Sequence, residues 1–510
     1  MTLTLRLFPA LALIMLWQSS SQEPPPAGPE APSGFRARGL TEEEVLLWWR
    51  DDARGASRLR LEFSADGEKW CPLADLPPSA VVYSARGLAA AATHQFRLAA
   101  VAEGGEVAWT EARAATTFAA LGTGRHFYVR PDGDDDADGS AGAPFRTISR
   151  AVAAVQPGDT VWIAGGVYHE SIALKGGLAG AWISYRNLPG EQPVLEGEAR
   201  RANGLMVHGT GFVEIRGLAA RNFAYNGISC RETGPVIVRR CQLYRNGSAG
   251  LALNYSALTA QLLVEDNITY ENGWGYGWAS GIHLNNKLQG ENVVHVIRRN
   301  LSYNNFDGSE YHTDGNGLMF DLGGTGSFCL IESNVCYNNG GRGINVLDGT
   351  AYVLHNTTFR NGWDSSFEWA AAELAVANHY RNEAGQSIVR NNVLWARPKV
   401  RGYGGVIHLV RGARPSFAGN LVWSDREEEV RTLPDGASAF AAPLAFVSVA
   451  QDNEFVEIHG RQFLRMDAND YDLRLRNWPA GAPMSQDTGL RTGFGGSSRD
   501  PSAPGAGAWP

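Results

Sequence analysis

The densest group of side chains able to do acid–base or metal chemistry lies between residues 307 and 321. Its members are Asp307, Glu310, His312, Asp314, Asn316 and Asp321. Carboxylates, an imidazole and an amide at this spacing can hold a hard cation through oxygen atoms or move a proton. Asp314-Gly315-Asn316-Gly317 also has the composition of an ordinary tight turn, because Asp and Asn are turn formers. The cluster is therefore either a functional site or a turn.

A short repeat surrounds this cluster and indicates how the chain must position it. The unit Asn-x-x-Tyr-x-Asn occurs at Asn300–Asn305 and again at Asn334–Asn339. An aromatic residue follows three positions after each of these residues: Asn222, Cys241, Asn267, Asn300, Asn334, Asn356, Asn392 and Asn420. The variable spacing fits a fixed turn with loops of different length. We expect the asparagines to be buried and to hydrogen-bond from coil to coil as a ladder.

A glycine-led strand follows the aromatic turn in five successive copies. Alternation along each strand predicts two buried rows, which contain Ile228, Leu251, Ile282, Leu318 and Ile344, and Cys230, Leu253, Leu284, Phe320 and Val346. The opposite face is then expected to be exposed. In this register one contiguous polar patch forms on that face from His283, Asn285, Asn316, Asp321, Arg342 and Asn345. A slip of one residue in any coil would turn its members inward.

The ends of the chain predict a secreted protein with two structured parts. An apolar run after Arg6 followed by small residues predicts a secretory signal over residues 1–22, so we expect an extracellular or periplasmic protein without a membrane span after signal removal. Residues 23–33 form a Pro-rich linker. The net charge of −8 argues against nucleic acid as a partner. Five scattered cysteines do not form a disulfide framework.

Residues 34–118 contain short β-rich segments, an Asp66-Gly67 hairpin signal and an early Trp49. They resemble a fibronectin type III module, which implies a spacer or docking role. Residues 124–480 resemble secreted right-handed parallel β-helix proteins, which implies that fold with an N-terminal cap, and a short helix over Ile148–Val155 is expected to cover the open end. The acidic loop Asp132–Asp138 is either a Ca²⁺ loop or a solvated turn. Residues 481–510 are a C-terminal tail.

The predicted fold class is thus all-β. Three further runs of sequence resemble a known family. "HTDGNGLMFDLGG", "NVCYNNGGRGINV" and "NTTFRNG" resemble secreted bacterial β-helix proteins and are similar to polysaccharide lyase family 9, the pectate lyases. That family carries a catalytic lysine between Gly-Asn-Gly and Leu-Gly-Gly. Alignment on Gly315-Asn316-Gly317 puts Met319 at that position, and alignment on Leu322-Gly323-Gly324 puts Asp321 there. The resemblance implies the fold and a polysaccharide partner, but it does not supply the base.

Lyase cleavage of an acidic polysaccharide requires a base for the proton at C5, a cation that neutralises the carboxylate, and help for the leaving oxygen. We expect His283 or Lys287 as the base, with His312 or Tyr311 assisting, and Arg342 as the neutralising cation. Asp314 and Asp321 are the candidate Ca²⁺ ligands. The candidate substrate-binding residues are Asn285, Asn316 and Asn345.

Two other functions remain open at this point. Asp314 and Asp321 could form the carboxylate pair of a glycoside hydrolase. Alternatively, the protein binds glycans or decorates a cell surface without catalysis. Loop aromatics would then either stack on sugars or fill the loop interior: Trp274, Tyr276, Trp278, Trp363 and Trp369.

Overall fold

The computed structural model describes most of the chain up to residue 424. The described ranges are 28–254, 261–285, 293–321, 327–364, 366, 371–378, 387–396 and 405–424, together with the backbone of five short strands between 437 and 475. The expected signal segment 1–22, the tail 481–510 and Lys287 lie outside these residues. The described residues contain no helix that is long and apolar enough to cross a membrane.

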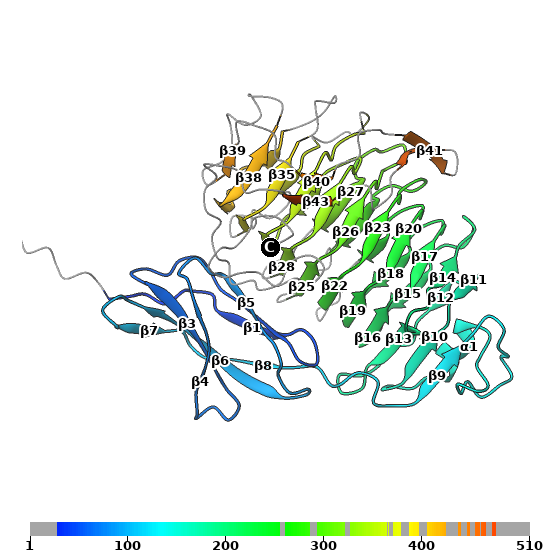
Figure 1. Cartoon of the computed structure of the whole chain (residues 1–510), viewed down its shortest axis with the longest axis horizontal. Helices are drawn as coiled ribbons and strands as arrows, with labels where there is room; N and C mark the ends of the chain where they lie inside the picture. Colours follow the sequence, from blue (N-terminus) through cyan, green and yellow to red (C-terminus); the bar gives the residue numbers. More distant parts are fainter. Residues whose placement is uncertain are drawn as a thin grey trace, which may run out of the picture.

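The N-terminal part is a small antiparallel β-sandwich (Figure 1). One sheet has the order β1-β2-β5, with bounds Arg36–Gly39, Val45–Trp48 and Val82–Ala85. The other has the order β4-β3-β6-β7, with β8 also paired to β6, and its strands are Cys71–Leu76, Arg58–Ser64, Thr93–Val101, Val107–Trp109 and Arg113–Thr116. Trp49 is buried between them, and its indole N–H donates to the Ala80 carbonyl at 2.6 Å.

The rest of the described chain is a right-handed parallel β-helix with three long sheets that run along the solenoid (Figure 1). Sheet I contains β9 His126–Val129, β10 Thr160–Ile163, β13 Ile183–Asn187, β16 Val213–Arg216, β19 Pro235–Arg239, β22 Gln261–Glu265, β25 Val294–Arg298, β28 Phe328–Glu332, β31 Thr350–Leu354, β34 Ile388–Arg390 and β37 Ser416–Ala418. Sheet II contains β11 Gly166–Tyr168, β14 Pro193–Glu196, β17 Ala219–Arg221, β20 Gln242–Tyr244, β23 Ile268–Tyr270, β26 Leu301–Tyr303, β29 Val335–Tyr337, β32 Thr357–Phe359, β35 Val393–Trp395, β38 Asn420–Trp423 and β39 Ala437–Ala439. Sheet III contains β12 Ile172–Ala173, β15 Leu205–His208, β18 Ile228–Arg231, β21 Leu251–Asn254, β24 Ser280–Asn285, β27 Asn316–Asp321, β30 Ile344–Leu347, β33 Leu374–Ala377 and β36 Ile407–Val410.

Four short strands follow the solenoid and pair antiparallel. They are β40 Phe446–Ser448 with β43 Asp472–Leu475, and β41 Glu454–Ile458 with β42 Arg461–Arg465. The last strand added to a parallel sheet is β39, which pairs with β38.

A short helix covers the first coil, as expected from the sequence. Helix α1, Ile148–Ala154, lies beside β9 at one end of the solenoid (Figure 1). Thr147 caps it by accepting from the backbone N–H of Arg150, and Ile148 and Ala151 are buried. The Asp135 carboxylate accepts from the backbone N–H and the hydroxyl of Thr147 at 2.8 and 2.9 Å. Asp135 therefore has a structural role in the acidic loop at the helix entry.

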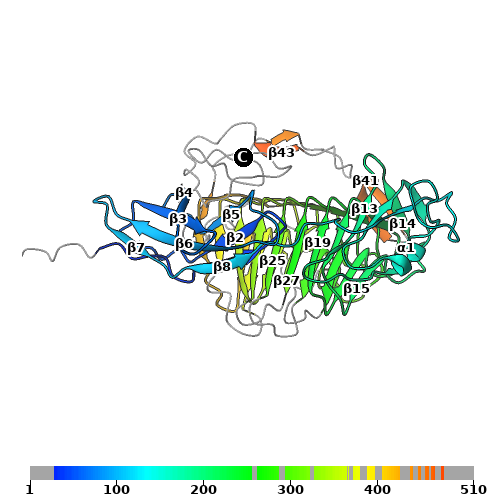
Figure 2. The same ribbon diagram turned by 90° about the horizontal axis from the view of Figure 1, so that it is seen from below.

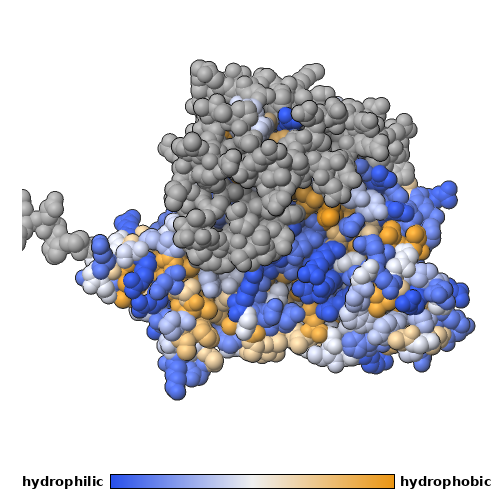
Figure 3. All heavy atoms as spheres, in the orientation of Figure 1, coloured by the Kyte–Doolittle hydropathy of each residue, from blue (hydrophilic) through white to orange (hydrophobic). Residues whose placement is uncertain are grey.

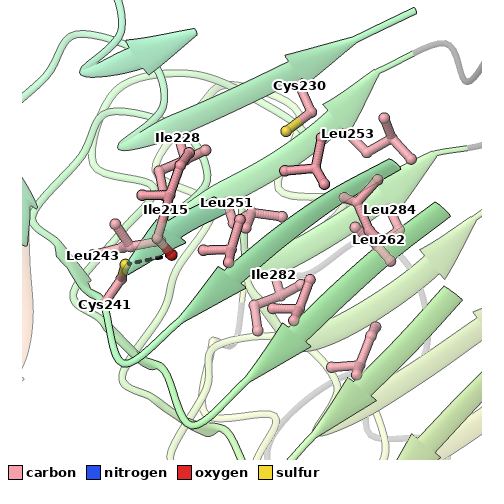
Figure 4. Close-up of a cluster of buried hydrophobic side chains, with 14 of the residues drawn as sticks. Ile215, Ile228, Cys230, Cys241, Leu243, Leu251, Leu253, Leu262, Ile282 and Leu284 are labelled. Carbon is pink, nitrogen blue, oxygen red and sulfur yellow. Dashed lines mark hydrogen bonds between the residues drawn. The ribbon is translucent and has the colours of Figure 1, made fainter. Parts of the chain in front are cut away.

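The interior of the solenoid consists of stacked rows of apolar side chains. Ile228, Leu251 and Ile282 form one row, and Cys230, Leu253 and Leu284 form the next (Figure 4). All of these side chains are fully buried. Both predicted rows and their register are confirmed. The five cysteines are free, and only Cys71 among them is exposed.

Two asparagine ladders fix the turns at either end of sheet II. One runs through Asn267, Asn300, Asn334, Asn356, Asn392 and Asn420, and the other through Asn246, Asn272, Asn305, Asn339 and Asn361. In the first ladder, Asn334 Nδ2 donates to Asn356 Oδ1 at 3.0 Å and to the Ile297 carbonyl at 2.9 Å. Tyr270, Tyr303 and Tyr337 stack alongside with nearly parallel rings. The predicted ladder is confirmed.

The sandwich packs directly on the outer face of sheet I (Figure 2). Leu40, Leu46, Val81 and Val82 from the sandwich share one buried cluster with Ile237, Leu263, Val296, Leu330 and Leu354 from sheet I. The Trp48 ring stacks on Phe328 with centroids 4.7 Å apart. Tyr352 Oη donates to the Trp49 carbonyl at 2.6 Å. The module is therefore a fixed cover of sheet I and not a spacer.

A buried ion cluster lies within this interface. Arg298 donates to both carboxylate oxygens of Glu44 at 2.7 and 2.9 Å, and its Nε donates to Glu265 at 2.8 Å. Burial raises the pKa of Glu44, but the charge and hydrogen bonds of Arg298 outweigh it and hold the pKa well below its usual range. In the space-filling view hydrophilic and apolar residues are interspersed over the described part of the face shown (Figure 3).

Candidate functional site

The predicted polar patch lies on three consecutive strands of sheet III: β24, β27 and β30. His283 pairs in register with Met319, which pairs with Asn345, and Asn285 pairs with Asp321. The predicted register is therefore confirmed. The prediction that this face is exposed is wrong, because His283 is only 5% exposed, Asn345 1% and Asp321 9%. A buried polar group requires a partner, so the contacts of each side chain show its role.

His283 is held between two acceptors. Its Nδ1 lies 3.1 Å from the Trp278 carbonyl, and its Nε2 lies 3.4 Å from Asp321 Oδ2 on the next coil. Asn285 Nδ2 donates to the same Asp321 oxygen at 3.2 Å. Burial by itself lowers the pKa of His283, but the Asp321 hydrogen bond and the charges of Asp321 and Asp314 raise it above its ordinary value. The imidazole is thus favoured in its charged form.

Asp314 and Arg342 form a second group that Asn316 connects. Asn316 Nδ2 donates to Asp314 Oδ1 at 3.0 Å, while its Oδ1 accepts from the backbone N–H of Arg342 at 2.9 Å. Burial raises the pKa of the Asp314 carboxyl to about 6, against a partial opposing effect of His283 and Arg342. Burial lowers the pKa of Arg342 to about 10, and Asp314 opposes that shift. Asp314 therefore lies within the electrostatic reach of both cationic side chains, while the carboxylates of Asp307 and Asp321 add to the rise of its pKa.

The loop that carries Asp314 is shaped by Asp307. The Asp307 carboxylate accepts from the backbone N–H groups of Ser309, Thr313 and Asp314 at 3.1 Å each, and from the Ser309 hydroxyl at 2.6 Å. Gly315 has a φ of 82°, and a Cβ there would lie 2.8 Å from the Asp307 backbone nitrogen. The chain therefore bends at Gly315 and enters β27 at Asn316, and this bend presents Asp314 to the site.

Asn345 is the one member of the patch whose amide is left without partners. Both its Oδ1 and its Nδ2 are buried and lack a hydrogen-bond partner within the described part of the chain. Leaving such a group unsatisfied costs about 1–3 kcal/mol. A buried amide in this state, one coil beyond Met319, is an available donor and acceptor for a bound ligand.

The structure does not join every predicted residue to this group. His312 instead lies 3.5 Å from Asp364 Oδ2, at ion-pair distance, and its ring is 6.3 Å from that of Phe306. Met319 and Asp321 are the two alternative positions for the lysine of the resembling family, and Met319 Sδ accepts from Asn316 Nδ2 at 3.4 Å. Lys287 is outside the described residues. The Trp278 carbonyl was missed, because its role follows from backbone geometry that residue types do not encode.

The geometry does not suit Asp314 and Asp321 as a Ca²⁺ pair, which the sequence had suggested. The Asp314 oxygens accept from the Asn316 amide and from the Thr313 hydroxyl at 3.2 Å, and Asp321 accepts from His283 and Asn285. Ca²⁺ prefers six to eight oxygen ligands, whereas the charged neighbours of Asp314 include a guanidinium and an imidazole as well as the carboxylates of Asp307 and Asp321. The described residues include no group of three or more His, Cys, Asp or Glu side chains that could hold a metal.

Comparisons with known proteins agree with this architecture. Residues 127–308 match the family model described as the Pel9A-like, right-handed beta helix region. Two curated proteins match over short segments: the uncharacterized protein YwoF of Bacillus subtilis, 39% identical over 79 residues, and the pectate lyase PEL9 of Emericella nidulans, 38% identical over 74 residues. These segments cover 15% and 14% of this chain but only 17% and 18% of the relatives.

Two solved structures are similar to different parts of this chain. The crystal structure of pectate lyase Pel9A matches 76% of this chain and 97% of its own, at 18% identity and a TM-score of 0.42. A fibronectin type III structure matches 18% of this chain at 22% identity and a TM-score of 0.16. In the described residues the chain consists of a small antiparallel β-sandwich docked on a parallel β-helix. Over residues 127–308 that β-helix is similar to the Pel9A-like, right-handed beta helix region.

Proposed function

We propose that the protein processes an acidic polysaccharide, and that the group His283, Asp314, Asn316, Asp321, Arg342 and Asn345 cleaves it by β-elimination. The observation that carries the proposal is the Asp314 carboxyl, whose pKa is raised to about 6 between two cationic side chains. A base with a pKa near the working pH is both ionised and basic enough to accept a proton. Similarity to pectate lyases supports the class of substrate.

The two cationic side chains, Arg342 and protonated His283, position the substrate. Arg342 binds the uronate carboxylate, and the positive charge of protonated His283 nearby adds to the withdrawal of electrons that makes the proton at C5 more acidic. His283 is kept in the charged form by Asp321, whose Oδ2 lies 3.4 Å from its Nε2. The roles predicted from sequence therefore change: His283 acts as a cation, and Asp314 acts as the base.

The chemical step then balances within this group and solvent. The Asp314 carboxylate takes the C5 proton, the electron pair forms the double bond between C4 and C5, and the bond from C4 to the leaving sugar oxygen breaks. The leaving oxygen takes a proton from water, while the Asn345 amide hydrogen-bonds to the substrate. Asp314 finally releases its proton to solvent. No step is routed through Ca²⁺, because the carboxylates do not form an oxygen cage.

Hydrolysis is a second candidate, which one observation favours. Asp314 and Asp321 lie in different environments, the first with a raised pKa and the second hydrogen-bonded to His283. Such a pair is the usual acid–base arrangement of glycoside hydrolases. Secretion, with the signal segment removed, belongs to the same proposal, since a polysaccharide substrate lies outside the cell.

Incubation with polygalacturonate, alginate and a neutral glucan tests the proposal. Elimination leaves an unsaturated uronate that absorbs in the ultraviolet, and hydrolysis leaves new reducing ends without this absorbance. We expect ultraviolet-absorbing products from a polyuronate and none from the neutral glucan. New reducing ends without this absorbance would show that the protein hydrolyses the polymer and does not cleave it by elimination. The absence of product from every polymer would refute catalysis. Secretion is checked by finding the mature N-terminus near residue 22 in the culture medium.

A further inference from the structure

Large aromatic side chains are exposed beside the candidate site. Trp278 is 60% exposed, Tyr311 51% and Tyr276 49%, and Tyr225 is exposed on an earlier coil. These four account for most of the exposed large aromatic residues in the described part of the chain. Apolar groups that gather on a surface in this way mark binding sites.

The rings form two neighbouring pairs along the solenoid. Trp278 and Tyr311 have centroids 6.0 Å apart and planes only 8° from parallel. Tyr225 and Tyr276 are 4.6 Å apart in an edge-on arrangement. Tyr225 comes from the turn before β18, Tyr276 and Trp278 from the turn before β24, and Tyr311 from the turn before β27, so the four residues lie along one edge of sheet III with the coil of β21 between the first and the second. We call these four residues the aromatic ridge.

The backbone holds the ridge in a fixed position. The N–H groups of Gly275 and Tyr276 donate to the Gly247 carbonyl at 3.0 and 2.7 Å, and Trp274 Nε1 donates to the Arg245 carbonyl at 2.7 Å. A Cβ on Gly277 would lie 3.1 Å from the Tyr311 ring, so glycine allows the two turns to approach. Trp274 and Trp363, by contrast, are partly buried and donate to main-chain carbonyls, so they belong to the loop interior.

Trp278 connects the ridge to the site directly. It has a φ of 59°, a conformation that is uncommon for a bulky residue. Its carbonyl oxygen accepts a hydrogen bond from His283 Nδ1 at 3.1 Å. Backbone strain of this kind persists where the surroundings require it, often at ligand sites. The same residue therefore orients His283 with its main chain and presents its indole to solvent.

We propose that the aromatic ridge is a set of sugar-binding subsites. They hold the part of the polysaccharide chain that lies over the coils on the N-terminal side of the candidate site. The Trp278 and Tyr311 rings stack on the apolar C–H face of the sugar nearest to the site, and Tyr276 and Tyr225 contact the following sugar. Aromatic rings suit this role because they combine a flat apolar surface with a polar group at one edge. The inference rests on the proposed polysaccharide substrate, and it adds where on the solenoid the sugar chain binds and which residues bind it.

Calorimetric titration with polygalacturonate oligosaccharides tests the ridge separately from catalysis. The titrations use the Asp314→Asn variant, so that bound chains are not consumed. We expect Trp278→Ala and Tyr311→Ala to weaken binding of long oligosaccharides about tenfold each, and Trp278→Phe to restore most of the loss. Trp109→Ala, which removes an exposed ring of the sandwich, is the matched control and is expected to bind normally.

The outcomes distinguish this inference from the proposed function. Long oligosaccharides that bind equally well to the ridge variants and to the parent overturn the ridge, whether or not the wild-type protein is active. Ridge-dependent binding by a wild-type protein that never turns over the polymer supports the ridge and contradicts the catalytic proposal. In an active enzyme, Trp278→Ala is expected to raise KM about tenfold with little change in kcat. A loss confined to kcat would instead indicate displacement of His283.

Discussion

His283 and Asp321 lie on neighbouring coils of sheet III, with Nε2 of the imidazole 3.4 Å from Oδ2 of the carboxylate. Both side chains are nearly buried, so their attraction is only weakly screened by water. The pair raises the pKa of His283, whereas burial raises that of Asp314 to about 6. Two groups in one site, the Asp314 carboxyl and the His283 imidazole, are therefore expected to titrate at shifted pH values.

A bell-shaped pH profile of kcat/KM is the first prediction. Activity requires ionised Asp314, so it falls as the pH drops through about 6. It also requires charged His283, so it falls again as the pH rises above the raised pKa of that side chain. Initial rates across the pH range measure both limbs. An acid limb near the ordinary pKa of an aspartate would contradict the role of Asp314.

Asp314→Asn is expected to stabilise the folded protein at neutral pH. The carboxyl has a raised pKa when folded and its ordinary pKa of 3.8 when unfolded, so its ionisation costs stability as the pH rises from about 4 through about 6. Removing the charge gains up to about 3 kcal/mol at neutral pH and little below pH 4. Chemical denaturation at both pH values measures the difference. A variant destabilised equally at both would contradict this account.

Arg298→Met is expected to destabilise the protein by about 3–5 kcal/mol, because the buried carboxylates of Glu44, Glu265 and Glu332 would lose the cation that they share. Glu265 would keep Arg299, and Glu44 would keep the longer contact with Arg86. The loss should shrink in acid, where the carboxylates can be protonated. The control is Arg54→Met, which breaks an exposed pair with Glu30 and should change stability by less than about 1 kcal/mol. Equal effects in the two variants would show that the buried cluster does not hold the sandwich in place.

Asn334→Ala tests the ladder that positions the coils. Its amide nitrogen donates to Asn356 and to the Ile297 carbonyl, and its oxygen accepts from Asn300. Removing it leaves several buried groups unpaired, at about 3–5 kcal/mol in total. Thermal or denaturant unfolding measures the loss, with Asn254→Ala, a half-buried asparagine on β21, as the matched control. A loss below about 1 kcal/mol would contradict a structural role for the ladder.

The sequence predicted the solenoid and its register because the same physical signal recurs in each coil. The Asn ladder and the alternation at Ile282 and Leu318 leave one register that buries apolar side chains. Burial of His283 and Asn345 could not be predicted, since alternation reports which side of a strand a residue occupies and not what covers that side. His312 was misplaced for a similar reason, because its partner Asp364 lies two turns away.

The sequence of the sheet I strands does indicate that another part of the protein covers their outer face. Strands of sheet I, such as Gln261–Glu265 and Phe328–Glu332, have apolar residues on both faces. A strand with one solvated face alternates, whereas a strand buried on both faces reads as a continuous apolar run. Leu263 and Leu330, which point away from the solenoid interior into the sandwich interface, are the residues that carry this information.

The most direct test of the account compares wild-type protein with Asp314→Asn on a polyuronate in the presence of a chelator. The measurement is the ultraviolet absorbance of the unsaturated product, with folding of the variant verified by its unfolding transition. The account predicts product formation by the wild type without added Ca²⁺, and a rate at least about 100-fold lower for the variant. An Asp314→Asn variant that forms the unsaturated product at the wild-type rate would contradict the central claim that Asp314 is the base.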